Sequence, residues 1–369
     1  MIINEKRLID RFCEYVKINS ESGNEKAFYN RLLKDVKEIG FTPKTDDCGG
    51  KCGSNANNIY AYLDGDKTSC PRFLAFHMDT VPTGGKIVPV VGKEEITSDG
   101  TTILSADDKG AIAAFFEAVC ILRENNIPHI PIEVVFTIGE EQGLIGAKNF
   151  DIGILKSKKG LVFDISKPTN FIVSHSPYKT KFDVIINGKS AHAGINPQDG
   201  VSAAMIFADA VKDMKLLRVD DETTANIGCI HGGTGSNVVM SQLVVGCEVR
   251  SISRKKHDDQ LSHMIDCFKN SAKMLGGNAE IKITNQYNGY IIDRESENLK
   301  IVSDIITSLG KDVQFISSGG GSDANIFISK GLDVLNIGTG MENIHGNNET
   351  QNINELKLMV EIICRYLSK

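Results

Sequence analysis

The 369-residue sequence contains no tryptophan, no long hydrophobic run and no strongly basic segment. No apolar stretch approaches the roughly 20 residues that a membrane-spanning helix needs, so we expect no membrane partner. The longest basic run is Arg254-Lys255-Lys256, and the formal net charge is −6. Nucleic-acid-binding proteins normally carry a basic excess, so we also expect no nucleic-acid partner. The N-terminal segment MIINEKRLIDRFCEY lacks the apolar stretch of a signal peptide.

Cysteine occurs nine times but without a regular framework. An odd number of scattered cysteines is typical of reduced thiols, and it predicts a cytoplasmic protein. The close pair Cys48 and Cys52 has no second pair to complete a zinc site, so we interpret it as a flexible surface turn. A G-x-S-x-G motif is absent, and no cysteine stands in a recognisable catalytic motif. The sequence therefore disfavours a serine or cysteine nucleophile.

Strand and helix patterns alternate in the first part of the chain. Three apolar runs are predicted to be buried strands: Phe73–Phe76, Ile132–Ile138 and Leu161–Phe163. A helix with an apolar stripe from Ile112 to Leu122 lies between the first two. This alternation predicts an α/β fold with a mainly parallel sheet that is covered on both faces. In such sheets, ligands bind at the carboxyl ends of the strands.

The pattern changes after about residue 177. The strands and helices predicted over the next ~110 residues, among them a helix over Gly200–Leu217, follow the order βαββαβ, which is typical of a ferredoxin-like α+β unit. Strand and helix patterns like those of the first part of the chain return near Ile291. They include predicted helices at Glu297–Ser308 and from Glu355 to Leu367. We therefore predict a discontinuous α/β domain formed by residues 1–177 and 289–369, interrupted by an α+β insert formed by residues 178–288.

Each predicted strand of the α/β domain is followed by side chains that could bind a metal or transfer a proton. His77 and Asp79 follow the first strand, Glu140 and Glu141 the second, and Asp164 the third. Several carboxylates gathered at one sheet edge would repel one another and would be costly to desolvate without a cation. Histidine and carboxylate ligands without thiolate favour Zn²⁺, with Co²⁺ or Mn²⁺ as substitutes. A carboxylate that bridges two ions would account for a set larger than one catalytic zinc needs.

Asp107 is the candidate for this bridging position. It lies in the segment LSADDKG, immediately before the apolar helix. A carboxylate at this place could instead cap the helix, with Asp108 in the first turn. From this segment alone both interpretations stay open.

Six motifs occur along the chain in a characteristic order: HMDTVP, SADDKGAIAA, TIGEEQGLIGAKNFD, LVFD, SAHAG and IHGNNE. In these motifs the sequence resembles the di-zinc aminopeptidase/aminoacylase/carboxypeptidase family, and most closely its peptidase T and tripeptidase branch. The resemblance covers nearly the whole chain, although the segment between Asp79 and Asp107 is shorter than in peptidase T itself. It implies a zinc-binding catalytic domain with an inserted lid and dimerisation domain.

The resemblance also implies two Zn²⁺ ions per subunit. His77, Asp107 and Asp164 would hold one zinc. Asp107, Glu141 and His345 would hold the other, so that Asp107 bridges the two ions.

Two further residues of the α/β domain receive roles from the resemblance. Glu140 would be the general base, which takes a proton from a metal-bridging water and passes it to the leaving amine. Asp79 would orient His77 or tune its basicity, since alternation along a strand directs residues two apart to the same side.

Residues of the insert and of a late glycine-rich loop complete the implied site. His192, in SAHAG, would reach a neighbouring subunit and stabilise the tetrahedral oxyanion, which requires a homodimer formed through the insert. Asn237 and Arg250 match family positions that bind a substrate carboxylate. Gly320 and Ser322, in GGGSD, match a loop that lines the substrate site. Each of these roles has an open alternative. His192 could be an ordinary surface histidine, Arg250 could form a surface ion pair, and the glycines of GGGSD could simply allow a tight turn.

We expect a cytoplasmic, zinc-dependent exopeptidase that releases the N-terminal residue from tripeptides or other short peptides. An N-acyl amino-acid deacylase or a carboxypeptidase would use the same chemistry, and the need for a free α-amine on the substrate would distinguish them. An inactive dimeric binding protein is an alternative of another class. The presence of every candidate ligand together with Glu140 disfavours it.

Overall fold

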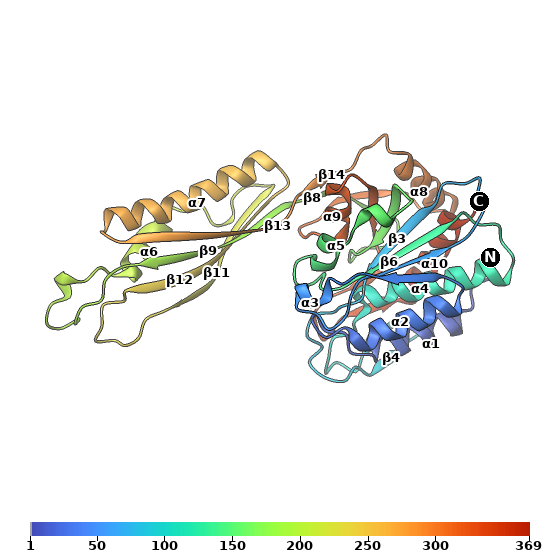
Figure 1. Cartoon of the computed structure of the whole chain (residues 1–369), viewed down its shortest axis with the longest axis horizontal. Coiled ribbons are helices and arrows are strands. Elements are labelled where there is room, and N and C mark those ends of the chain that lie inside the picture. Colours follow the sequence, from blue (N-terminus) through green and yellow to red (C-terminus); the bar gives the residue numbers. More distant parts are fainter. Residues whose placement is uncertain (1) are drawn as a thin grey trace. The chain divides into compact units, whose positions relative to one another are not determined.

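The computed structural model describes residues 2–369 and contains two compact units (Figure 1). Unit 1 is formed by the chain up to Ser174 together with Ile291–Lys369, and unit 2 is formed by His175–Tyr290. The chain leaves unit 1 within strand β8 (Phe171–Ser176) and returns to it within β14 (Tyr290–Ile291). Unit 2 is thus an insertion into the chain of unit 1.

The main sheet of unit 1 has nine strands within residues 2–369, in the order β1-β2-β6-β3-β7-β16-β8-β14, with β15 paired to β8. Its remaining strands are β1 (Thr42–Thr45), β2 (Ile59–Leu63), β3 (Arg72–His77), β6 (Ile132–Thr137), β7 (Lys159–Phe163), β15 (Gln314–Ser317) and β16 (Asp333–Ile337). The centre is parallel, since β3 pairs in parallel with β6 and β7, and β16 with β7. The predicted α/β class with a mainly parallel sheet is confirmed.

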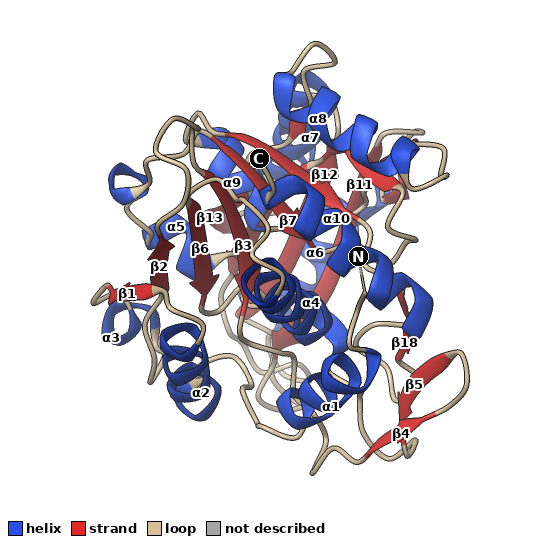
Figure 2. Cartoon of the chain, turned by 90° about the vertical axis from the view of Figure 1, so that its right-hand side faces the viewer, coloured by secondary structure: helices blue, strands red, loops and turns tan. Residues whose placement is uncertain are grey.

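The central strands are continuous apolar runs because both of their faces are covered. All six residues of β6 are buried, as are the last five of β3. The predicted intervening helix is α4 (Ala106–Glu124), which packs on β3 and lies between α1 and α10 (Figure 2). The other helices of unit 1 are α1 (Glu5–Val16), α2 (Lys26–Glu38), α3 (Gly49–Cys52), α5 (Ile145–Asn149), a 3₁₀ turn (Ile152–Ile154), α8 (Glu297–Ser308), α9 (Asp323–Ser329) and α10 (Ile353–Leu367). No helix within residues 2–369 has the length and apolar character that a membrane span requires.

Unit 2 has the strand order β10-β11-β12-β9-β13, and every pair in it is antiparallel. Its elements are β9 (Tyr178–Asn187), a 3₁₀ turn (Pro197–Asp199), α6 (Ala203–Lys212), β10 (Leu217–Arg218), β11 (Thr223–Gly232), β12 (Gln242–Ser251), α7 (Arg254–Met274) and β13 (Asn278–Tyr287). The core joins alternate residues of β9, such as Phe182 and Val184, to Ile206 of α6 and Phe268 of α7. The main elements follow the βαββαβ order of a ferredoxin-like unit.

Two local predictions from the sequence were wrong, and one small sheet was not predicted. A single helix was expected over 200–217, but α6 begins after Ser202, whose hydroxyl accepts from the Met205 amide at 3.3 Å, and it ends at Lys212. The expected flexible turn at Cys48 and Cys52 is the short helix α3, and Cys48 is buried. A second sheet in unit 1, β17-β18-β5-β4, was not predicted, because its strands are short and half-exposed. Its strands are β4 (Pro89–Val91), β5 (Glu95–Ser98), β17 (Met341–Glu342) and β18 (Thr350–Asn352).

Candidate metal centre

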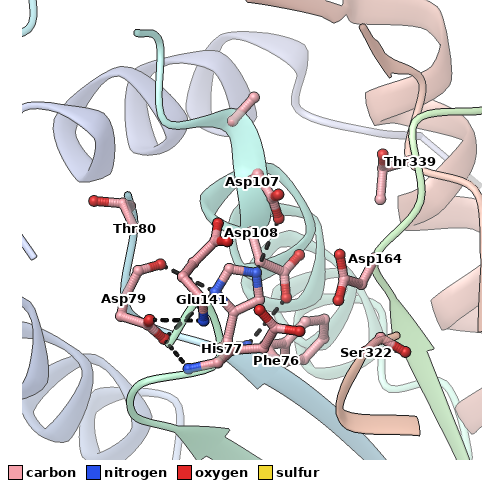
Figure 3. Close-up of polar contacts among 12 residues, drawn as sticks. Phe76, His77, Asp79, Thr80, Asp107, Asp108, Glu141, Asp164, Ser322 and Thr339 are labelled. Atoms are coloured by element: carbon pink, nitrogen blue, oxygen red, sulfur yellow. Dashed lines mark hydrogen bonds and ion pairs between the residues drawn. The ribbon is translucent and has the colours of Figure 1, made fainter. Parts of the chain in front are cut away.

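The carboxyl ends of three adjacent parallel strands deliver the polar side chains of the centre. His77 is the last residue of β3, Glu140 and Glu141 follow β6, and Asp164 follows β7. Because β3 pairs in parallel with both β6 and β7, these ends lie at one edge of the sheet. Figure 3 shows Asp107, Glu141 and Asp164 gathered around the His77 ring.

Asp107 enters the centre from the first turn of α4. Its backbone is not helical (φ −77°, ψ 110°), and the N-cap position is taken by Ser105. Asp108 also departs from helical geometry, so α4 is kinked at these two residues. Asp107 Oδ1 lies 2.9 Å from His77 Nε2 and Asp107 Oδ2 lies 3.5 Å from His345 Nε2. One carboxylate thus faces two imidazoles with its two oxygens, which is the arrangement that a bridging ligand requires.

His345 reaches the same place from the loop between β17 and β18. Its Nε2 lies 2.8 Å from Glu141 Oε1, and its side chain is 42% exposed, whereas His77 is 2% exposed. The centre therefore has a buried side at His77 and a side open to solvent at His345.

Three groups of side chains in the described part of the chain could each hold a cation, with candidate ligand atoms within 4.8 Å of one another: His77, Asp107 and Asp164; Asp107, Glu141 and His345; His77, Glu140 and Glu141. The first two contain the same residues as the two zinc sets expected from the sequence. They share Asp107. The geometry thus brings together all five expected ligands and the expected base.

The electrostatics of the centre are those of crowded carboxylates. Burial and the negative charge of Asp164 raise the pKa of Glu140 well above its ordinary value. Burial and the charge of Asp107 do the same to the pKa of Asp164. Burial also opposes ionisation of Asp107, but the positive charge of His77 holds the Asp107 pKa below its ordinary value. A cation between these groups would favour their charged forms.

Asp79 contacts both His77 and the turn that carries the two glutamates. Its carboxylate oxygen is 3.6 Å from His77 Nδ1, whereas its backbone carbonyl is 3.0 Å from that nitrogen. The carboxylate also accepts the backbone N–H groups of Glu140 at 2.9 Å and Glu141 at 3.2 Å, and the Ser22 hydroxyl at 2.6 Å. Asp79 therefore fixes the turn that carries both glutamates, and its carbonyl fixes the His77 ring.

The two residues expected from the glycine-rich loop lie in different surroundings. The amide of Gly320 donates to Ser318 Oγ at 3.1 Å. Ser322 is buried, and its hydroxyl accepts from Asn336 Nδ2 at 3.1 Å. The Asn336 side chain also pairs with both the N–H and the C=O of Asp164, at 3.0 Å each. Ser322 is thus connected to the metal centre through the backbone of Asp164.

The three expected residues of the insert belong to unit 2. His192 and Asn237 are exposed and lie on adjoining loops, where Ala193 N–H donates to the Asn237 carbonyl at 3.0 Å. Arg250 lies within β12, and its Nε donates to Glu248 Oε1 at 2.6 Å. The ion pair considered for Arg250 is therefore present.

Sequence reasoning missed four residues that support the centre: Ser22, Asp108, Asn336 and Glu349. Asp108 is buried, and its Oδ2 accepts a hydrogen bond from the backbone N–H of His77 at 3.2 Å. The peptide bond between Asp107 and Asp108 is cis. Glu349 lies in the IHGNNE motif and Asp108 in SADDKG, so these two motifs offered a signal. Ser22 and Asn336 stand in no motif that pointed to them.

Comparison with known proteins identifies the family. The sequence model of peptidase family M20/M25/M40 matches residues 73–369. The chain belongs to this family. Among relatives of this M20/M25/M40 peptidase, the uncharacterised protein YqjE of Bacillus subtilis is 38% identical over 368 residues, which are 100% of this chain and 99% of the relative.

Two solved structures closely match the M20/M25/M40 peptidase described here. An aminopeptidase PepT from Bacillus cereus has a TM-score of 0.91 and 37% identity, covering 99% of this chain and 98% of its own. A tripeptidase from Staphylococcus aureus has a TM-score of 0.95 and 37% identity, covering 100% and 98%. The resemblance to peptidase T and tripeptidases is thus confirmed, and the chain is a metallopeptidase by family.

Proposed function

We propose that this M20/M25/M40 peptidase is a zinc-dependent aminopeptidase that releases the N-terminal residue from tripeptides or other short peptides. The observation that carries the proposal is the pair of side-chain groups that share Asp107, at the carboxyl edge of the sheet. The similarity to a tripeptidase and to an aminopeptidase over nearly the full chain supports the choice of substrate.

The residues present fit a pair of zinc ions. His77 and Asp164 would hold one ion, Glu141 and His345 the other, and Asp107 both. Imidazole and carboxylate oxygens without thiolate suit Zn²⁺, with Co²⁺ or Mn²⁺ as substitutes. No hydrogen bond from residues 2–369 reaches the Asp164 carboxylate, so its oxygens are available to a cation. When bound, two such ions would activate a water molecule and polarise the scissile carbonyl.

Glu140 serves as the general base in this proposal. It is 8% exposed, and no hydrogen bond from the described residues reaches its carboxylate, so it is free to accept a proton. Its raised pKa suits a group that both takes a proton from the attacking water and returns it to the leaving amine. Asp79 holds the Glu140 amide, and so the position of the base relative to His77.

Substrate recognition is assigned to residues of both units. Asn237 and Arg250 would bind the substrate carboxylate, with Gly320 and Ser322 beside the substrate. His192 would stabilise the oxyanion in the site of a second subunit, so the proposal includes a homodimer formed through unit 2. The nine cysteines are unpaired in the structure, which supports a cytoplasmic location.

Hydrolysis of a small substrate panel tests the proposal. The panel contains a free tripeptide, its N-acetylated form, the matching dipeptide and an N-acetyl amino acid, each with zinc-loaded and chelator-treated protein. We expect chelator-sensitive cleavage of the free tripeptide with release of its first residue. Cleavage of the acetylated compounds instead would overturn the aminopeptidase and favour a deacylase or carboxypeptidase. No cleavage of any compound would favour a binding protein.

A further inference from the structure

Glu349 is a buried carboxylate that accepts the backbone N–H groups of four consecutive residues. Its Oε2 accepts from Leu104 at 2.9 Å and Ser105 at 2.7 Å, and its Oε1 from Ala106 at 2.8 Å and Asp107 at 3.2 Å. Glu349 is 1% exposed. All four donors lie ahead of or within the first turn of α4, where backbone N–H groups have no partner within the helix.

The segment that Glu349 holds has an irregular backbone. Ser105 is left-handed (φ 66°), a conformation that non-glycine residues rarely adopt, and Asp107 departs from helical geometry. A backbone of this kind keeps its shape only when its surroundings fix it. The four hydrogen bonds to one carboxylate supply that constraint directly at the residue whose side chain faces both His77 and His345.

Glu349 also lies four residues after His345, in the loop that brings this histidine to the centre. Its own amide donates to the Gly346 carbonyl at 3.0 Å, which closes the turn between the two residues. Glu349 therefore joins the segment that carries His345 to the segment that carries Asp107. Residues 104–107 and 345–349 are far apart in sequence, and the hydrogen bonds of Glu349 link them directly.

We infer that Glu349 is a positioning residue of the metal centre, which places the shared ligand Asp107 through its backbone. The inference rests on the two-metal centre of the proposed function. Glu349 is in none of the three candidate ligand groups, and amides occupy both of its oxygens. It therefore acts on the metals through Asp107. A glutamine at 349 would keep one acceptor oxygen and turn an NH₂ group towards two N–H donors.

Glu133 provides a matched control. It too is a fully buried carboxylate that accepts backbone N–H groups, from Lys156 at 2.9 Å and Ser157 at 2.7 Å. It lies near the start of β6, whereas the metal centre lies beyond the end of that strand. Glu133→Gln disturbs a buried carboxylate of the same kind at the opposite end of β6 from the candidate ligands.

The experiment is calorimetric titration of the metal-free full-length protein with Zn²⁺, together with the visible absorption spectrum of the Co²⁺ form. We expect two ions on the wild type and on Glu133→Gln, with equal affinities. We expect Glu349→Gln to bind at least one ion about 10–100-fold more weakly, as for other residues that orient metal ligands. Its Co²⁺ spectrum should also change, because that spectrum reports ligand geometry rather than stability.

Glu349→Asp keeps the charge but is one methylene shorter, and it guards against a glutamine variant that does not fold. We expect its zinc affinity to fall between those of the wild type and Glu349→Gln, or below wild type if it alone folds. Wild-type affinity and spectrum in every folded variant at position 349 would overturn the inference and leave the proposed function intact. A wild-type protein that binds no zinc would overturn both.

Discussion

A buried glutamate lies near the start of strand β6 and another lies just beyond its end, and the two carboxylates differ in the hydrogen bonds that they accept. Glu133 accepts the Tyr60 hydroxyl at 2.7 Å and the amides of Lys156 and Ser157. Glu140 accepts no hydrogen bond from residues 2–369 on its carboxylate, and it lies among the charges of Asp164 and Glu141.

The difference separates a carboxylate used for folding from one kept for chemistry. A buried charge is costly unless it is paired or hydrogen-bonded. At the start of β6 the protein supplies donors to Glu133. At the end of the strand, further carboxylates lie around Glu140 without such donors. In the proposed function, bound cations would compensate their negative charge.

The largest expected effect is a loss of turnover when Glu140, the carboxylate that accepts no hydrogen bond from residues 2–369, is replaced. Glu140→Gln should lower kcat by about 10²–10⁴-fold, because the amide cannot accept the proton. The zinc content, measured by elemental analysis, should stay at two ions per chain. Glu133→Gln, assayed in parallel, should keep its kcat. Near-normal turnover by Glu140→Gln would remove Glu140 from the mechanism.

Metal removal should come next in size. Saturation with Zn²⁺ at about 100 times the Kd should stabilise the fold by about 2.7 kcal/mol for each ion. Differential scanning calorimetry with zinc and with chelator measures this as a rise in Tm. Mg²⁺, which prefers six oxygen ligands, serves as the control and should stabilise far less. Equal melting with zinc and with chelator would argue against a metal centre.

A smaller effect, on stability rather than on turnover, is expected when Glu133, the carboxylate with three hydrogen-bond donors, is replaced. Glu133→Gln should lower the free energy of unfolding by about 1–3 kcal/mol, because one buried amide N–H loses its acceptor. Urea denaturation of the metal-free protein measures the loss. The interpretation of Glu133 as a purely structural residue fails if this variant loses zinc or turnover while its stability is unchanged.

The smallest effect is a pH dependence of the metal-free protein. Burial raises the pKa of Asp323 to about 6, and burial together with the charge of Asp107 raises the pKa of Glu349 to about 7. Carboxyls with raised pKa bind protons more readily in the folded than in the unfolded chain, so the fold gains stability as pH falls through these values. Hydrogen bonds that the Asp107 and Glu141 carboxylates accept from the His345 ring raise the pKa of His345 to about 10, and this contribution to stability is lost as pH rises towards that value.

All these shifts act in the same direction between pH 8 and pH 5. With chelator present, the Tm should therefore rise by a few degrees as the pH falls across this range. With zinc, the slope should be smaller or reversed, because protons compete with the metal for the same ligands. A metal-free Tm that falls steadily from pH 8 to pH 5 would contradict the crowding of charge at the end of β6.

Much of the fold and of the candidate site could be predicted because it is encoded locally. The helix predicted over Glu297–Ser308 is α8, and its bounds are the same in the structure. The side chains after β3, β6 and β7 could be grouped because parallel strands bring their carboxyl ends to one edge. The motif resemblance gave Asp107 and His345 their expected roles as ligands, since no periodic pattern connects them to that edge.

What could not be predicted depends on contacts between distant segments. Strand β16 is short and resembles any apolar pentapeptide, so its place in the sheet is set by β7 and β8. The Asp79 carboxylate pairs with His77, two residues away, but no pattern in the sequence indicates that it also accepts amides beyond β6. The partners of Glu349 are backbone groups, which leave no trace in side-chain identity.

The order of the chain has a consequence for the synthesis of the protein. Strand β16 lies between β7 and β8 in the sheet but follows the whole of unit 2 in the sequence. In a growing chain, the edge of β7 that pairs with β16 therefore stays without this partner until residues 333–337 have been made. His345 arrives later still, and α10, which packs on α4, arrives last. In the proposed function His345 is a metal ligand, so a chain that ends before residue 345 lacks part of the proposed centre.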